Sequence, residues 1–304
     1  MKKRAEEAAN GSLNDIEERT ADLGSRHRRL ARRKKSMQDS GSKKTKIITV
    51  TSLKGGVGKS TVTANLGYSL ALRGKQTLVI DCDFNIRNLD LIMGLEDRVV
   101  YDFGDAVKGS VKAERAVIRD PRSEYLSMCA APYTDFQIPS EQAFSSVIDE
   151  FVSSGRYDYI VIDTPGDSGT VMKLAVGCSD IAVIVTTHNP ASLRAAERTG
   201  ALVQGFGARE SFLVINNFSY SETKLGYFPG ILSVIDRAGV GLLGVIPDDE
   251  AIQRYQEDGI LVAQTGLVEC KAAFTNIAAR ICGEDVPLFA GFPKKAARKY
   301  LAAL

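Results

Sequence analysis

A glycine-rich run near the start of the chain constrains the fold most. It follows the β-branched segment Ile47–Thr51 and precedes an apolar, helix-forming segment over residues 62–72. A strand, a glycine-rich turn and a helix in this order form a phosphate-binding loop, in which backbone N–H groups turn towards the phosphates. The predicted phosphate cradle consists of Lys54, Gly55, Gly56, Val57, Gly58, Lys59, Ser60 and Thr61.

The charged and hydroxyl residues of this run have distinct roles. Lys59 stands where its ammonium group would reach the terminal phosphates of a nucleotide, and the Ser60 hydroxyl stands where it would contact Mg²⁺. Lys54 is the unusual member, because it adds a second positive charge ahead of the glycines. The run therefore predicts a site for a nucleotide polyphosphate with Mg²⁺.

From Lys46 onward, short apolar runs alternate with segments of helical pattern. Continuous β-branched runs are typical of strands covered on both faces, and their alternation with helices predicts a parallel sheet. We therefore expect an α/β fold, a doubly wound, mostly parallel sheet with helices on both faces. The predicted strands cover residues 46–51, 76–80, 125–128, 158–162, 180–186, 211–216 and 242–246. The predicted helices lie near residues 60–72, 140–152, 168–177, 190–203, 228–238 and 268–281.

Carboxylates follow two of the predicted strands, at the edge where doubly wound sheets bind ligands. Asp81 and Asp83 follow the second strand, and this pair suits Mg²⁺ binding and the positioning of water. Asp163 ends the fourth strand as a further candidate Mg²⁺ ligand, and Gly166 after it would allow a hinge. The alternatives are an Asx turn at the first pair and a helix cap at Asp163. The neighbouring phosphate loop favours the functional interpretation.

Other polar residues after strands carry weaker signals. Asn216 and the turn at Pro247 and Asp248 could border a nucleotide base, and each could equally be an ordinary strand end or helix cap. His188 could line the site, but a buried structural histidine is the stronger expectation. These residues do not define a base pocket by themselves.

The charge of the chain is unevenly distributed. Residues 1–46 hold 14 Lys or Arg against 7 Asp or Glu, so the remainder is mildly acidic within a net charge of +2. The leader over residues 1–45 is polar and basic, and we expect it to be disordered or a solvated helix. It is either an electrostatic contact for anionic lipid or nucleic acid, or a solvated tail. It lacks aromatic residues, which disfavours single-stranded nucleic acid.

The cysteines and the apolar runs exclude other classes of protein. The five cysteines form no C-x-x-C pair and are odd in number, which fits a reducing compartment better than a disulfide framework. No apolar run approaches the ~18 residues of a membrane span, and the N-terminus lacks the apolar core of a secretory signal. We therefore expect a cytoplasmic protein.

The last residues predict a short basic amphipathic helix that begins at Pro293. Its apolar face consists of Ala297, Tyr300, Leu301 and Leu304. The basic residues around that face are Lys294, Lys295, Arg298 and Lys299. Such a helix at a chain end is typical of an interfacial membrane anchor, and a helix docked on the domain is the alternative. We expect three regions, a leader over 1–45, a phosphate-loop domain over 46–285 and a tail over 286–304.

Four stretches of the chain carry a family resemblance. Lys54–Thr61 resembles the deviant Walker A motif of the MinD/ParA ATPases, and Ile86–Leu95 with Arg98–Phe103 resembles the MinD branch, which determines the septum site. The segment Gly244–Asp249 is similar to the same branch, so the resemblance covers roughly residues 46–304. It implies a P-loop fold, ATP and Mg²⁺ as cofactors, and slow ATP hydrolysis that a partner stimulates.

The resemblance also implies roles for matching positions. Lys54 would reach the partner's phosphates in an ATP-bound dimer, and it forms the implied catalytic set with Lys59 and Asp83. Asp83 would orient the attacking water, and Asp163 would hold Mg²⁺ together with Ser60. Hydrolysis would then separate the dimer.

The remaining implications concern the adenine and the partners. Asn216 and the Pro247 turn would border the adenine, and the C-terminal helix would bind the anionic inner face of the cell membrane in the ATP state. A MinC-like division inhibitor and a MinE-like or DivIVA-linked topological factor are the implied partners. The alternatives are ParA-type partitioning of chromosomes or plasmids, flagellar-number positioning and, less favoured, a metal-cluster scaffold. Nucleic acid binding by the leader is not favoured.

Two segments depart from the MinD pattern, and the basic leader is an addition to it. Thr164–Gly169 reads TPGDSG where that branch more usually has Ser-Pro-Ala-Gly, which affects coupling to a partner. The C-terminal helix has fewer bulky apolar residues than usual, which predicts a weak anchor.

Overall fold

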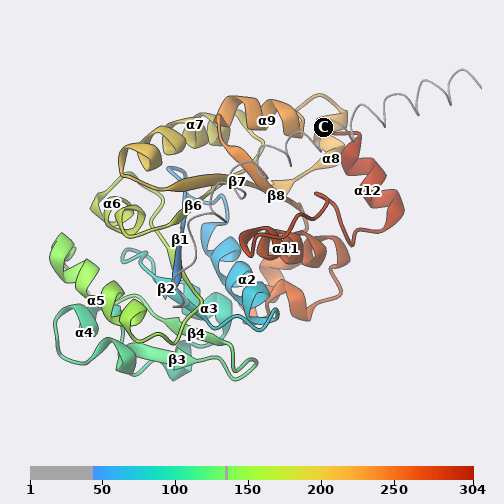
Figure 1. The fold of residues 1–304 in the computed structure, drawn as a ribbon. Coiled ribbons are helices and arrows are strands. Elements are labelled where there is room, and N and C mark those ends of the chain that lie inside the picture. Colours follow the sequence, from blue (N-terminus) through green and yellow to red (C-terminus); the bar gives the residue numbers. More distant parts are fainter. Residues whose placement is uncertain (1–43, 134–135) are drawn as a thin grey trace, which may run out of the picture.

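Eight strands form one sheet in the computed structural model, which describes residues 44–133 and 136–304. The strand order is β3-β4-β2-β5-β1-β6-β7-β8, and every pair is parallel except β3 with β4 (Figure 1). The strands are β1 Lys46–Thr51, β2 Thr77–Asp81, β3 Val117–Arg119, β4 Leu126–Cys129, β5 Tyr159–Asp163, β6 Ile181–Thr186, β7 Glu210–Phe218 and β8 Gly241–Pro247. The predicted α/β fold is confirmed.

Helices cover both faces of this sheet, with α2 and α11 on one face and α5, α6, α7 and α9 on the other (Figure 1). The helices are α2 Lys59–Ala71, α3 Leu89–Met93, α4 Phe103–Val107, α5 Glu141–Ser153, α6 Thr170–Gly177, α7 Pro190–Gly205, α8 Tyr220–Lys224, α9 Ile231–Ala238, α10 Ala251–Glu257, α11 Val268–Ile281 and α12 Lys294–Leu301. Three short 3-10 turns lie at Glu96–Arg98, Ala113–Ala116 and Val262–Gln264. This arrangement is doubly wound, as predicted.

The central strands are buried along their whole length. Every residue of β2, β5 and β6 is buried, because helices shield both faces of the sheet. Local signals set several helix starts: the Ser140 side chain caps α5, and Asn189 caps α7 with Pro190 in its first turn. The buried strands end at one edge, where their polar terminal residues converge.

The expected strands and longer helices are present, with ends that differ by at most three residues. Sequence analysis missed β3, a three-residue strand that pairs antiparallel at the sheet edge. It also missed α3, α4 and α8, which have five residues each. Elements this short bury too few apolar side chains to give a clear period.

The C-terminal segment packs on the domain. Phe289, Phe292, Ala296, Tyr300 and Ala303 are buried in the largest apolar cluster of the structure. The predicted boundary between residues 285 and 286 therefore does not separate two bodies, because the tail shares the core of the domain. The predicted amphipathic pattern is correct, and its apolar face covers protein.

Two expectations from the sequence concern membranes and the leader. Within the described ranges, no helix has the length and apolar character needed to cross a membrane. The predicted basic leader lies outside the described residues except for Lys44 and Thr45.

Candidate nucleotide-binding site

The phosphate loop joins the end of β1 to the start of α2. Gly56 and Gly58 adopt positive φ angles of 74° and 89°, a conformation that strains side chains with a Cβ. In the described part of the chain, a Cβ added to Gly55 or Gly56 would meet nothing within 4 Å, so this side of the loop is open. The loop therefore forms a concave backbone surface that a phosphate chain can approach.

The N-terminus of α2 concentrates positive charge on this loop. Lys59 begins the helix and is 8% exposed, and no acidic residue lies in the first turn. Free backbone N–H groups and the helix dipole make such an end an anion site. The position of Lys59 agrees with its predicted contact to the terminal phosphates.

Asp163 lies at the end of β5 and faces the first turn of α2. Its Oδ2 accepts a hydrogen bond from Ser60 Oγ at 2.6 Å, and its Oδ1 accepts one from Thr63 Oγ1 at 2.9 Å. Burial raises the pKa of Asp163 to about 6, although both hydroxyl groups and the charge of Lys59 oppose that rise. A fully buried carboxylate beside a hydroxyl suits a cation, so Ser60 and Asp163 are placed as the predicted Mg²⁺ pair.

Thr63 is a contact of Asp163 that sequence analysis missed. It follows Ser60 by three residues, and the two side chains therefore lie on the same face of α2 and hold the two oxygens of Asp163. The three-residue spacing from Ser60 is the sequence signal that could have identified Thr63.

Asp81 holds the segment after β2 in place. Its two carboxylate oxygens accept hydrogen bonds from the backbone N–H groups of Asp83 at 2.9 Å and of Leu89 at 3.1 Å. Burial, followed by the charge of Asp163, raises the pKa of Asp81 well above its ordinary value. Each oxygen of Asp81 thus accepts one backbone N–H group, and the metal role predicted for Asp81 stays a prediction.

The hydrogen bonds of Asp81 position the segment that carries the Asp83 carboxylate. The residue is 6% exposed, and burial raises its pKa above the ordinary value while the charge of Lys59 lowers it. Asp83 and Lys59 are thus close enough to interact electrostatically. The structure brings the predicted water-positioning acid to the same sheet edge as Ser60 and Asp163.

The segment after β5 lies against the phosphate loop. A Cβ added to Gly166 would lie 3.1 Å from the Gly55 nitrogen and 3.2 Å from Lys59 Nζ. This close approach explains the glycine and places the predicted hinge beside the terminal-phosphate position. Asp167, one of the departures noted in the sequence, is exposed, and its charge contributes to the raised pKa of Asp83. Asp167 therefore adds negative charge near the reacting end of the site.

Asn216 supports the phosphate loop from the end of β7. Its Nδ2 donates a hydrogen bond to the Val57 carbonyl at 2.9 Å and lies 2.2 Å from a Cβ added to Gly58. Its Oδ1 is buried without a hydrogen-bond partner among the described residues. The Asp248 N–H donates to the Phe218 carbonyl, which brings the Pro247 turn next to β7. The adenine contact of Asn216, Pro247 and Asp248 stays a prediction.

His188 is a packed histidine, as expected. It is buried between the rings of Phe218 and Phe228, with centroids 4.9 and 4.8 Å away, and accepts a hydrogen bond from the Ser219 N–H. Burial lowers its pKa. Its contacts in the described part of the chain are with residues 218–228 rather than with the phosphate loop.

Lys54 lies at the start of the phosphate loop. Its backbone N–H donates to Ser52 Oγ at 3.3 Å, and its side chain is half-buried without an ion-pair partner in the described residues. Its charge is therefore available to a group that is not part of the protomer.

A glycine-rich loop before a helix, a buried acid on its serine and a second acid after the neighbouring strand define a P-loop nucleoside triphosphatase. The ParA family model, described as NUBPL iron-transfer P-loop NTPase, matches residues 43–282. The septum site-determining protein MinD of Bacillus subtilis is 36% identical over 79% of this chain and 90% of its own length. MinD of Synechocystis is 36% identical over 80% of this chain and 91% of its own length.

Solved structures agree with these relatives. The MinC:MinD cell division protein complex of Aquifex aeolicus has a TM-score of 0.76 and 32% identity, and covers 80% of this chain and 98% of that chain. MinD of Pyrococcus horikoshii complexed with Mg-ADP has a TM-score of 0.69 and 26% identity, and covers 84% of this chain and 98% of that chain. The chain belongs to the MinD/ParA family of P-loop ATPases, whose cofactors are ATP and Mg²⁺.

The residues present fit this cofactor pair. The open cradle at Gly55 and Gly56 admits a phosphate chain, and the hydrogen bond between Ser60 and Asp163 marks the donor set that would hold Mg²⁺. Bound Mg²⁺ would neutralise phosphate charge as the bond to the terminal phosphate breaks. Asp83 would position the water, and Lys59 would hold the phosphates.

Proposed function

We propose that this chain is an ATP-driven switch that places the cell-division septum. The observation that carries the proposal is Lys54 on an open phosphate loop, in a chain whose curated relatives are named septum site-determining proteins. Asp83 and Asp163 flank the loop, so the site has the parts for hydrolysis as well as for binding. ATP hydrolysis then sets how long the switch stays on.

Dimerisation is the first output of this switch. Lys54 would reach the terminal phosphate in a second copy, where the negative charge of ATP exceeds that of ADP. ADP would leave the ammonium group without that partner charge, so the closed dimer would form with ATP alone. Catalytic roles for Lys54, Lys59 and Asp83 belong to this proposal.

Membrane association is the second output. Lys294, Lys295, Arg298 and Lys299 are exposed on α12, and we propose that they bind anionic lipid at the inner face of the cell membrane. The apolar face of α12 is occupied: Tyr300 is 4% exposed and donates a hydrogen bond to Glu269 Oε2 at 3.2 Å. Insertion of Tyr300, Leu301 and Leu304 into a bilayer therefore requires α12 to leave the domain.

Two linked anchors explain why dimerisation would control membrane residence. One exposed basic helix binds weakly, whereas two on one particle gain an avidity of about 10²–10⁴. The protein would be cytoplasmic with ADP and peripheral at the membrane with ATP. We propose that three regions carry these functions: a leader over 1–45, an ATPase domain over 46–285 and a targeting tail over 286–304. The tail shares the core of the domain.

The partners follow from the relatives. The structural neighbour from Aquifex aeolicus is a MinC:MinD complex, so we propose a MinC-like division inhibitor as the partner of this chain. A MinE-like or DivIVA-linked topological factor would stimulate hydrolysis and confine the switch in space.

Co-sedimentation with anionic phosphatidylglycerol vesicles tests the proposal on the full chain. We expect binding with Mg-ATP to exceed binding with Mg-ADP by at least about tenfold, from the avidity of the dimer. Replacing Lys294, Lys295 and Arg298 by Gln should abolish the difference. A control that replaces Lys108, Lys112 and Arg119 by Gln removes equal charge at the opposite sheet edge and should bind normally. Equal binding of the unaltered chain with both nucleotides would overturn the membrane switch.

A further inference from the structure

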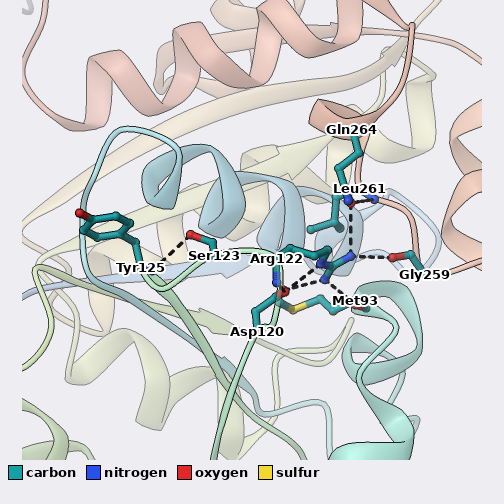
Figure 2. A network of polar contacts seen from close by, with 8 residues as sticks. All are labelled: Met93, Asp120, Arg122, Ser123, Tyr125, Gly259, Leu261 and Gln264. Atoms are coloured by element: carbon teal, nitrogen blue, oxygen red, sulfur yellow. Dashed lines mark hydrogen bonds and ion pairs between the residues drawn. The ribbon is translucent and has the colours of Figure 1, made fainter.

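A single guanidinium group joins three segments that are far apart in the sequence (Figure 2). Arg122 lies in the β3–β4 turn, and its Nε and Nη2 donate to the two oxygens of Asp120 at 2.8 and 2.6 Å. Nη2 also donates to the Met93 carbonyl at 2.6 Å, and Nη1 donates to the Gly259 carbonyl at 2.8 Å and to Gln264 Oε1 at 3.3 Å. We call this group the Arg122 clasp.

The clasp holds the C-terminal ends of two helices together. Met93 is the last residue of α3, and Gly259 follows the end of α10. The chain reverses at Gly94 and Gly259 with φ angles of 60° and 66°, and a Cβ on Gly259 would lie 2.5 Å from Gly94 Cα. The two helix ends are therefore in direct backbone contact, which any relative movement would disrupt.

The first of these helices leads to the water-positioning acid. The Leu89 N–H at the start of α3 donates to Asp81, and the same carboxylate accepts the Asp83 N–H. Asp83 and α3 are thus fastened to one buried side chain. A shift of α3 would move the segment that carries Asp83.

The second helix leads back to the phosphate loop. Gln256 in the last turn of α10 accepts a hydrogen bond from Thr61 Oγ1 at 3.2 Å, and Thr61 lies in the first turn of α2. The 3-10 turn after α10 is also tied to α2, because Asn65 Oδ1 accepts a hydrogen bond from the Val262 N–H at 2.8 Å. Hydrogen bonds therefore run from Asp83 through α3, Arg122 and α10 to the phosphate loop.

We propose that Arg122 is a positioning residue for ATP hydrolysis, which sets Asp83 relative to the phosphate loop through the ends of α3 and α10. The phosphate loop would hold the terminal phosphate, and Asp83 would hold the attacking water. A misplacement of about 1 Å between reacting groups can cost up to ~10²-fold in rate. The proposal concerns hydrolysis alone and stands whether or not the chain places a septum.

Arginine is the residue type that this position requires. The five N–H groups of the guanidinium meet five acceptors, which lie on three segments, and Asp120 is 1% exposed. Lysine keeps the charge but has three donors on one atom and cannot reach all five acceptors. The Arg122→Lys variant therefore loosens the helix ends while it retains the ion pair with Asp120.

The test compares Arg122→Lys with a matched control in the full chain. Arg280 also donates to backbone carbonyls, those of Leu243, Val286 and Pro287, and it lies on α11 outside the hydrogen-bond path to Asp83. We expect Arg122→Lys to lower kcat for Mg-ATP about tenfold while ADP affinity stays within about threefold. Arg280→Lys should leave kcat within about twofold.

A second variant keeps the proposal testable if Arg122→Lys does not fold. Gln256→Ala removes the bond to Thr61 and should lower kcat about threefold, and its effect combined with Arg122→Lys should be less than the product of the single effects. Two results overturn the proposal: a kcat in Arg122→Lys or Gln256→Ala equal to that of the control, and a parallel loss of ADP affinity, which indicates general loosening of the fold.

Discussion

At the residue scale, Asp163 shows a conflict between burial and charge. It is fully buried, and the hydrogen bonds from Ser60 and Thr63 do not prevent burial from raising its pKa to about 6. In the folded protein the proton is therefore bound more tightly than in the unfolded chain, where the pKa is about 3.9. A bound cation removes this conflict, which is a physical reason for the acid to occupy this position.

The conflict predicts a pH-dependent stability in the absence of nucleotide. Because the folded pKa is raised, the contribution of Asp163 to stability is full below about pH 4 and is lost as the pH rises through about 6. The Asp163→Asn side chain does not titrate. At pH 8 we therefore expect the free energy of unfolding of this variant, measured by urea titration, to exceed that of the parent by up to about 3 kcal/mol. The gain should be smaller at pH 5. A gain that is equal at both pH values would show that burial of the charge is not its cause.

The close packing around Gly166 gives a second prediction at the residue scale. A methyl group there would press on Gly55 and on Lys59 Nζ, within 3.2 Å. We expect Gly166→Ala to weaken Mg-ATP binding by about 1–2 kcal/mol, the usual cost of a small overpacking. Calorimetric titration measures it. Gly177→Ala is the control, because a Cβ there meets nothing within 4 Å in the described chain, and normal affinity in Gly166→Ala would contradict the assigned contact.

At the element scale, continuous apolar runs and the glycine loop were predictable. The runs that became β1, β5 and β6 are buried on both faces, so local composition and tertiary position coincide. The loop is predictable because the chemistry of phosphate binding constrains consecutive residues. The places of Ser60, Lys59 and Asp163 followed from these two signals.

Other features depended on contacts between distant segments. Asp81 accepts hydrogen bonds from two backbone N–H groups, and the Arg122 clasp joins residues up to 142 positions apart. Neither feature has a local sequence pattern. The apolar face of α12 was visible, but a helix pattern does not tell what covers it. Asn216 was predicted at the adenine, and the structure adds a hydrogen bond to Val57 that sequence could not show.

The docking of α12 gives the element-scale prediction. The Tyr300 ring contacts the rings of Phe289, Phe292 and Phe218, and its loss would leave a cavity. We expect Tyr300→Ala to lower the free energy of unfolding by about 3 kcal/mol, as for other buried aromatic side chains. Lys295→Ala on the exposed side of α12 should change it by less than about 0.5 kcal/mol. Denaturant titration measures both, and an unchanged Tyr300→Ala variant would mean that α12 is free in solution.

At the scale of the whole molecule, the parallel sheet brings the reacting groups to one edge. The phosphate loop and Asp83 follow β1 and β2, and Asp163 and Asn216 lie near the ends of β5 and β7, so these residues meet at one edge. Lys54 is half-buried at the same edge without an ion-pair partner among the described residues. An edge with an unpaired cation beside an open phosphate cradle is suited to closure against a second copy.

The mass of the full chain in solution tests this closure most directly. Sedimentation velocity would compare Mg-ATP with Mg-ADP in the Asp83→Asn variant, which we expect to retain ATP because the water-positioning acid is lost. The expected result is a dimer with Mg-ATP and a monomer with Mg-ADP, and a monomer in both states after Lys54→Ala is added. The same mass with both nucleotides, or an ATP-dependent dimer without Lys54, would contradict the proposed switch.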